Sequence, residues 1–90
     1  MVNAFVLIHI EGKDVKGIVK NLLSVDGITE VYPIAGEYDI LAVIRVNDNA
    51  KLSHIVTDEI IHKPGIRHTK TLFALDVHAK IDLAAAFGLK

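Results

Sequence analysis

Apolar and polar residues follow two different spacings along the chain, and together they predict four strands and two helices. Short runs rich in β-branched residues indicate strands at residues 4–10, 28–35, 38–46 and 66–77. Between the first two runs, apolar residues recur every three or four positions from Val15 to Leu23, with Asp14 as a helix cap. The same spacing returns after Asp48, and Pro64 and Gly65 end that second helix.

The chain contains an internal repeat. The segments AFVLIHI and ILAVIRV lie about 36 residues apart, and each half reads strand, helix, strand. This order predicts a ferredoxin-like α+β fold, βαββαβ, in which a four-stranded antiparallel sheet carries both helices on one face. The first and third strands are then central. Pro33 has no N–H for a strand partner, so the second strand is expected at an edge.

Both faces of the two central strands are largely apolar. One face is expected to lie under the helices. The other would carry Phe5, Leu7, His9, Leu41, Val43 and Arg45, with His9 near Arg45. An antiparallel sheet normally places polar residues on a face left to water. We therefore expect this face to pack against a second copy in a two-fold dimer of the dimeric α+β-barrel type.

Composition narrows the classes of function. Ninety residues make one domain, and 51% are hydrophobic, which is high for so small a chain. Ten basic residues are spread among eleven acidic ones, which argues against direct DNA binding. Without cysteine there is no disulfide or thiolate metal site. No apolar run is long enough to span a bilayer and no signal peptide is evident, so a soluble cytoplasmic protein is expected.

No motif for catalysis or metal binding is evident. The five histidines lack zinc-site spacing, and nucleophile and phosphate-binding motifs are absent, so we expect no catalytic residue, metal or cofactor. Asp48 and Asp82, like Asp14, are interpreted as helix caps.

Two local features remain as candidate binding elements. In the run Gly36-Glu37-Tyr38-Asp39 the glycine allows a turn, Tyr38 supplies an amphipathic wall, and Asp39 can accept hydrogen bonds from an ammonium group or from backbone N–H groups. An ordinary hairpin turn explains the run equally well. Thr69 and Thr71 share one face of the fourth strand, either as strand-forming residues or as hydroxyls lining a pocket at an interface.

The string VYPIAGEYDILAVIRV, followed by a helix, Pro-Gly-Ile and IRHTKTLFAL, resembles the effector-binding half, or RAM domain, of the Lrp/AsnC (feast/famine) transcription regulators. The resemblance covers residues 2–78. It implies dimers that assemble into tetramers, octamers or larger rings, with an amino acid or similar small effector bound between dimers. By this resemblance the pocket holds Gly36, Tyr38 and Asp39, with Glu37 in the same turn and Thr69 and Thr71 from the same subunit or a neighbour.

Two departures from the family pattern affect the prediction. Ala35 stands where the family has a small hydroxyl residue, which leaves the effector open. The first strand starts near residue 4, without the family's helix-turn-helix half, so we expect a stand-alone domain with a full-length regulator as a further candidate partner. Residues 1–78 would form the ligand-binding and oligomerisation domain. Residues 79–90 would form a tail, either a short helix or a frayed end.

Three alternatives stay open. A small dimeric enzyme of the monooxygenase type shares this topology, but it needs polar groups in a cavity between sheet and helices, where the helix stripes are apolar. An ACT-type amino-acid sensor would bind its ligand near Gly12. A purely structural interaction module would bind no small molecule.

Overall fold

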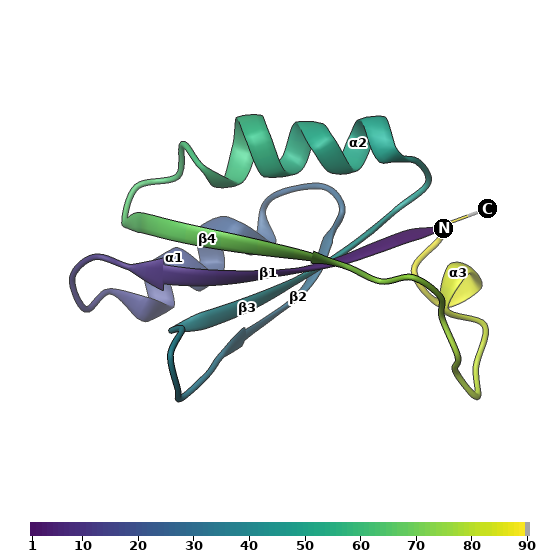
Figure 1. The fold of residues 1–90 in the computed structure, drawn as a ribbon, viewed down its shortest axis with the longest axis horizontal. Coiled ribbons are helices and arrows are strands. Elements are labelled where there is room, and N and C mark those ends of the chain that lie inside the picture. Colours follow the sequence, from purple (N-terminus) through teal and green to yellow (C-terminus); the bar gives the residue numbers. More distant parts are fainter. Residues whose placement is uncertain (90) are drawn as a thin grey trace.

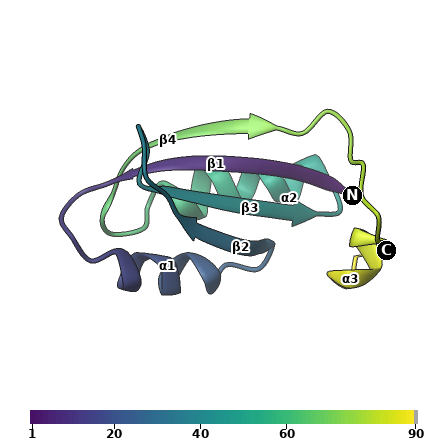
Figure 2. The same cartoon turned by 90° about the horizontal axis from the view of Figure 1, so that it is seen from below.

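The computed structural model describes residues 1–89 and has the predicted βαββαβ order, followed by a short C-terminal helix (Figure 1). The elements are β1 (Val2–Ile10), α1 (Val15–Leu23), β2 (Ile28–Pro33), β3 (Ile40–Val46), α2 (Asn49–His54), the π-helical turn η1 (Ile55–Ile60), β4 (Ile66–Phe73) and α3 (Leu83–Ala86). All strand pairs are antiparallel, in the order β2-β3-β1-β4. Figure 2 shows the strands side by side in this order, with α2 behind the sheet.

The sheet topology confirms three expectations. β1 and β3 are the central strands, and Pro33 lies in the edge strand β2. The fold is the ferredoxin-like α+β arrangement. Register follows the repeat, since Val6 of β1 lies opposite Ala42 of β3.

One apolar core lies between the sheet and the helices. Val6, Ile8, Ile40 and Ile44 from the central strands are fully buried with side chains of α1, α2 and η1, Leu22 among them. Burying each such side chain contributes about 1.5–3 kcal/mol. The core therefore fixes which face of β1 and β3 is covered and leaves their other face free of helices.

The helices begin where the aspartates predict. The Asp14 carboxylate accepts a hydrogen bond from the backbone N–H of Gly17 at 3.0 Å, and Asp48 caps α2 through Lys51 at 2.8 Å. Asp82 caps α3 in the same way. Of the two possibilities for the tail, the described residues 79–89 contain the short helix; Lys90 lies outside the described residues.

Strand ends differ from the expected bounds. β2 stops at Pro33 and β3 starts at Ile40, because residues 34–39 form a wider connection in which Gly36 has a φ of 146°. β4 ends at Phe73 and not at residue 77: Phe73 pairs with Ala4, the Ala74 N–H still donates to Asn3 O at 3.0 Å, and the chain then leaves the sheet. Within residues 1–89, no helix has the length and apolar character needed to cross a membrane.

Candidate functional site

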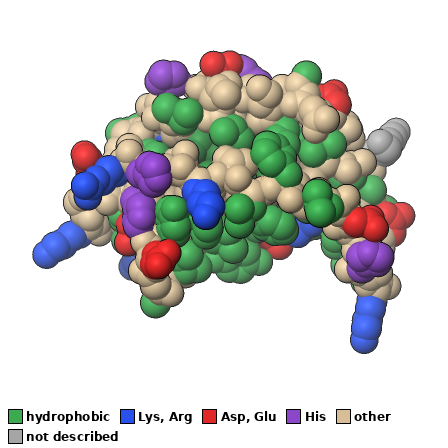
Figure 3. All heavy atoms as spheres, viewed as in Figure 1, with side chains coloured by type: hydrophobic (Ala, Val, Ile, Leu, Met, Phe, Trp, Pro, Cys, Tyr) green, Lys and Arg blue, Asp and Glu red, His purple; other side chains and the backbone are tan. Residues whose placement is uncertain are grey.

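The sheet face opposite the helices carries an apolar surface. Phe5 lies opposite Val43, and Leu7 lies opposite Leu41, across the β1–β3 pair. Val43 is only 4% exposed although it lies outside the main core, so its neighbours on this face already shield it. In Figure 3 a continuous apolar patch lies along the underside, between the projecting β2–β3 connection and the projecting tail. We call this surface the open face.

Arg45 is held at the tail end of the open face. Its guanidinium donates to the Glu30 carboxylate at 3.0 and 3.3 Å, and the Phe87 ring of the tail lies 4.8 Å from it. Partial burial raises the pKa of the Glu30 carboxyl, but the hydrogen bond and charge of Arg45 and hydrogen bonds from Thr29 and Tyr32 outweigh it, so this pKa lies below its ordinary value. Arg45 is therefore already paired within its own chain.

Within one copy, His9 lies at the opposite end of the open face from Arg45, so the two could be neighbours only across a dimer. Arg45 pairs with Asn3, six residues before His9 on β1. At about 3.3 Å per residue the two side chains start roughly 20 Å apart. The strand register decides this separation.

The Gly36–Asp39 turn is tied to β1 and β2 through Asp39. The Asp39 backbone N–H donates to Ile8 O at 2.9 Å, and Asp39 O accepts from Ile34 N at 2.9 Å. The Asp39 carboxylate also accepts from the Ile10 N–H at 2.9 Å, where the β1–β4 pairing is irregular. Asp39 thus fulfils the ordinary hairpin role, yet its side chain remains 47% exposed.

Aromatic stacking joins the turn to β1. The Tyr38 and His9 ring centroids are 4.3 Å apart with 19° between the planes. The His9 Nδ1 atom lies 3.7 Å from Asp39 Oδ2. The structure thus brings together Tyr38, Asp39 and His9, a combination that the sequence did not single out.

Thr69 and Thr71 lie on the other side of the sheet from the open face. They are opposite Ile8 and Val6, which belong to the core face, and β1 separates them from the turn. Thr71 lines an apolar groove of about 580 Å³ between α2 and β4. A single copy therefore does not bring the threonines and the turn into one pocket.

Arg67 and His68 are candidate residues that sequence reasoning missed. With His9 they line a shallow pocket at the start of β4, and the two histidine rings are 6.0 Å apart. Figure 3 shows histidine side chains gathered at this end, above the projecting turn. Only the β1–β4 register, which places His9 opposite His68, would have revealed the cluster.

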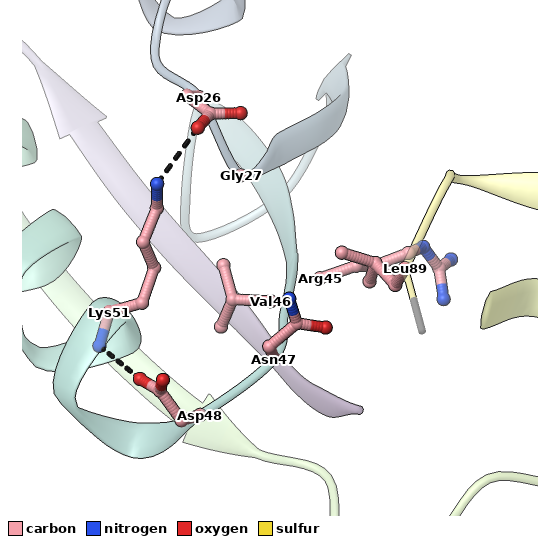
Figure 4. A pocket seen from close by; sticks show the side chains of 8 residues that line it. All are labelled: Asp26, Gly27, Arg45, Val46, Asn47, Asp48, Lys51 and Leu89. Carbon is pink, nitrogen blue, oxygen red and sulfur yellow. Dashed lines mark hydrogen bonds and ion pairs between the residues drawn. The ribbon is translucent and has the colours of Figure 1, made fainter.

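A second pocket lies at the other end of the sheet, where α2 begins (Figure 4). Lys51 reaches across it to the Asp26 carboxylate at 2.8 Å. This hydrogen bond and the attraction of the two charges lower the pKa of Asp26 and raise that of Lys51. Arg45 and Asp48, which also line the pocket, are engaged by Glu30 and by the Lys51 backbone N–H. Across residues 1–89, no group of three or more His, Cys, Asp or Glu side chains is placed to hold a metal ion.

Comparison with known proteins supplies the context for this geometry. The model of the Lrp/AsnC ligand binding domain matches residues 3–81. HTH-type transcriptional regulator FL11 of Pyrococcus abyssi is 32% identical over 75 residues, which are 83% of this chain and 49% of that protein. The chain thus spans about half the length of the curated relatives it matches.

Solved structures of other proteins have the same fold. The Thermus thermophilus protein TTHA0845 superposes with a TM-score of 0.81 at 32% identity, over 89% of this chain and 100% of that one. The Neisseria meningitidis transcriptional regulator NMB0573, solved in complex with L-Met, superposes with a TM-score of 0.76 at 21% identity, over 94% of this chain and 58% of that one. At that identity the second match shows the fold alone.

Proposed function

The chain belongs to the Lrp/AsnC ligand binding domain family, and from this premise we propose that it is an effector-sensing and self-associating module. An amino acid or similar small molecule binds at the Gly36–Asp39 turn, and its binding changes how copies assemble. The observation that carries the proposal is the open face, an apolar sheet surface bordered by the turn that holds Asp39.

Self-association follows from the open face. Phe5, Leu7 and Leu41 present a partly exposed apolar surface on the side of the sheet opposite the core, with Val43 buried among them. A second copy related by a two-fold axis would remove this surface from water, with gain in proportion to the area buried. Such dimers would then assemble into tetramers, octamers or larger rings.

Sedimentation analysis tests this interface. Leu7→Asp places a charge on the open face, so we expect a dissociated monomer at concentrations where the unmodified protein is associated. Leu23 is an exposed leucine of α1, away from the sheet face, and Leu23→Asp is the matched control that should leave the assembly unchanged. Unaltered association of the Leu7 variant, or an unmodified protein that stays monomeric at every concentration tested, would refute the proposal.

The effector site needs two copies in this proposal. One copy supplies the turn, whose Asp39 carboxylate is exposed enough to accept an ammonium group. The threonines are on the far side of β1 in the same chain, so a neighbouring copy would supply them. The L-Met bound by the Neisseria regulator supports the amino-acid class of ligand. The proposed ligand-binding residues are Gly36, Glu37, Tyr38, Asp39, Thr69 and Thr71.

A regulatory role without catalysis is part of the proposal. The relatives are named transcriptional regulators, and the space between sheet and helices is filled by apolar side chains such as Ile8, Ile40 and Ile44. A monooxygenase-type enzyme would need a polar cavity there. We further propose that the module acts in the cytoplasm without a cofactor and without direct DNA contact, and that a full-length regulator of the family is a candidate partner.

Native mass spectrometry with and without a pool of the twenty amino acids tests the whole proposal. We expect a bound amino acid and a shift in the distribution of assembly states, because a ligand favours the state that binds it better. Assemblies that retain no amino acid would favour the purely structural module. Ligand contacts at Gly12 would favour the ACT-type alternative.

A further inference from the structure

We propose that Arg67, His68 and His9 form an anion-binding site that takes the carboxylate of the effector, next to the Asp39 carboxylate that takes its ammonium group. The inference rests on the proposed function, since it names the chemistry by which the same end of the sheet recognises an α-amino acid. It adds three residues that lie outside the Gly36–Asp39 turn.

The geometry of the two strand ends places these groups together. His9 lies near the end of β1 and His68 near the start of β4, directly opposite each other in the antiparallel register. Their rings are 6.0 Å apart and 26° from parallel, and the His9 ring also stacks with Tyr38. Stacking with two partners restricts the His9 ring, so its N–H groups are held in place before a ligand arrives.

Arg67 and His68 have no hydrogen-bonding or charged side-chain partner among the described residues, unlike the basic residues Arg45 and Lys51. Arg45 is paired with Glu30, and Lys51 with Asp26. Within residues 1–89, no side-chain hydrogen bond or ion pair engages Arg67 or His68, and both residues are exposed. A guanidinium presents forked donors that match a carboxylate, and an imidazole N–H is a further donor. Arg67 and His68 therefore offer donors with no acceptor of their own in the described part of the chain, while His9 lies beside Asp39.

Asp39 supplies a negatively charged group beside these donors. Its Oδ2 atom accepts from Ile10 N and lies 3.7 Å from His9 Nδ1, which leaves Oδ1 without a hydrogen bond among the described residues. A carboxylate beside a group of donors is complementary to a zwitterion, whose two charges are also adjacent. The pocket lined by His9, Arg67 and His68 measures about 430 Å³, within the range of about 300–1,000 Å³ typical of small-molecule sites.

NMR titration of the histidine ring signals tests the site with a minimal probe. Propionate carries the carboxylate alone, and propylamine carries the ammonium group alone. At constant ionic strength, we expect saturable shifts of the His9 and His68 signals with propionate. Propylamine, which would bind at Asp39 beside His9, should leave the His68 signal unchanged. Linear shifts, or equal shifts with chloride, would show an adventitious ion only and overturn the inference.

Variants identify the residue that binds. Arg67→Gln shortens the side chain and removes its charge at an exposed position. We expect this variant to bind propionate at least about tenfold more weakly. Lys16→Gln removes a charge from an exposed position on α1 and is the matched control, with unchanged affinity. Equal propionate affinity in the Arg67 variant and the unmodified protein would overturn the inference.

The outcomes separate this inference from the proposed function. If the amino acid found by mass spectrometry binds equally well to the Arg67 variant, the carboxylate site is wrong and the sensing role stands. If propionate saturates the site while no amino acid binds, the anion site stands and amino-acid sensing fails.

Discussion

Replacement of Asp39 separates its role in the fold from its proposed role in ligand binding. The Asp39 carboxylate accepts the partly buried Ile10 N–H at 2.9 Å, where β1 leaves regular pairing with β4. Asp39→Ala leaves that N–H without a partner, which costs about 1–3 kcal/mol when buried, and partial exposure places this case near 1 kcal/mol. Asp39→Asn keeps an acceptor oxygen, so its loss should stay within about 0.5 kcal/mol.

Two measurements on both variants complete the test. Denaturant unfolding at one protomer concentration gives the free energy of unfolding, since association also stabilises the fold. Calorimetric titration gives the affinity for the amino acid that mass spectrometry identifies. We expect both Asp39 variants to bind at least about tenfold more weakly, because each removes the charge that pairs with the ammonium group. Unaltered ligand affinity of Asp39→Asn would refute the site assignment. Equal losses of stability would refute the role given to the Ile10 bond.

Three further predictions concern stability and the tail. A Cβ at Gly27, with φ of 108°, would lie 2.6 Å from a buried side-chain carbon, so Gly27→Ala should lower the free energy of unfolding by about 2–4 kcal/mol. Gly12→Ala, with φ of 77° and no atom within 4 Å, should lower the free energy of unfolding by only about 1–2 kcal/mol. Equal losses in the Gly27 and Gly12 variants would contradict the packing argument. The pKa of Glu30 is lowered by Arg45, so its stabilisation is present above the ordinary carboxyl pKa and lost as pH falls through the lowered value. Unfolding measured from pH 7 to 3 should show this loss, and Glu30→Gln should reduce it. Phe87→Ala removes the ring beside Arg45, so amide exchange in the tail should quicken with a global change below about 1 kcal/mol; unchanged exchange would show that the contact does not hold the tail.

The fold was predictable because the two hydrophobic spacings are strong signals. Alternation along β1 and β3 identified the core face, where Val6 and Ile44 are fully buried. Pro33 identified an edge strand because it lacks an N–H. Asp14 and the other caps marked helix starts through short-range geometry. Each of these signals acts over a few residues and needs no knowledge of the partner strand.

The candidate site was predictable only in part, because its geometry depends on contacts between distant segments. The pattern singled out Asp39 but not its bond to Ile10, 29 residues away in sequence. It placed Thr71 on the correct strand, but the face of that strand follows from its register with β1. The register also separates His9 from Arg45 and brings it to His68. Alternation alone defines faces within a strand and not which residues meet across strands.

The proposed effector site and the proposed interface meet at the same end of β1, where Asp39 contacts both. A change at one of these sites can therefore reach the other through Asp39. Its hydrogen bonds to Ile8 and Ile10 fix the end of β1, and His9 between them faces the side on which a second copy would pack. Coupling between sites is typically about 1–3 kcal/mol, and one hydrogen bond contributes a net of about 0.5–1.5 kcal/mol. A rearrangement of one or two of these bonds therefore suffices to shift the assembly, provided that the effector binds one assembly state better than the other. An effector with equal affinity for both states would leave the distribution unchanged however tightly it bound, so the shift in assembly measures the coupling directly.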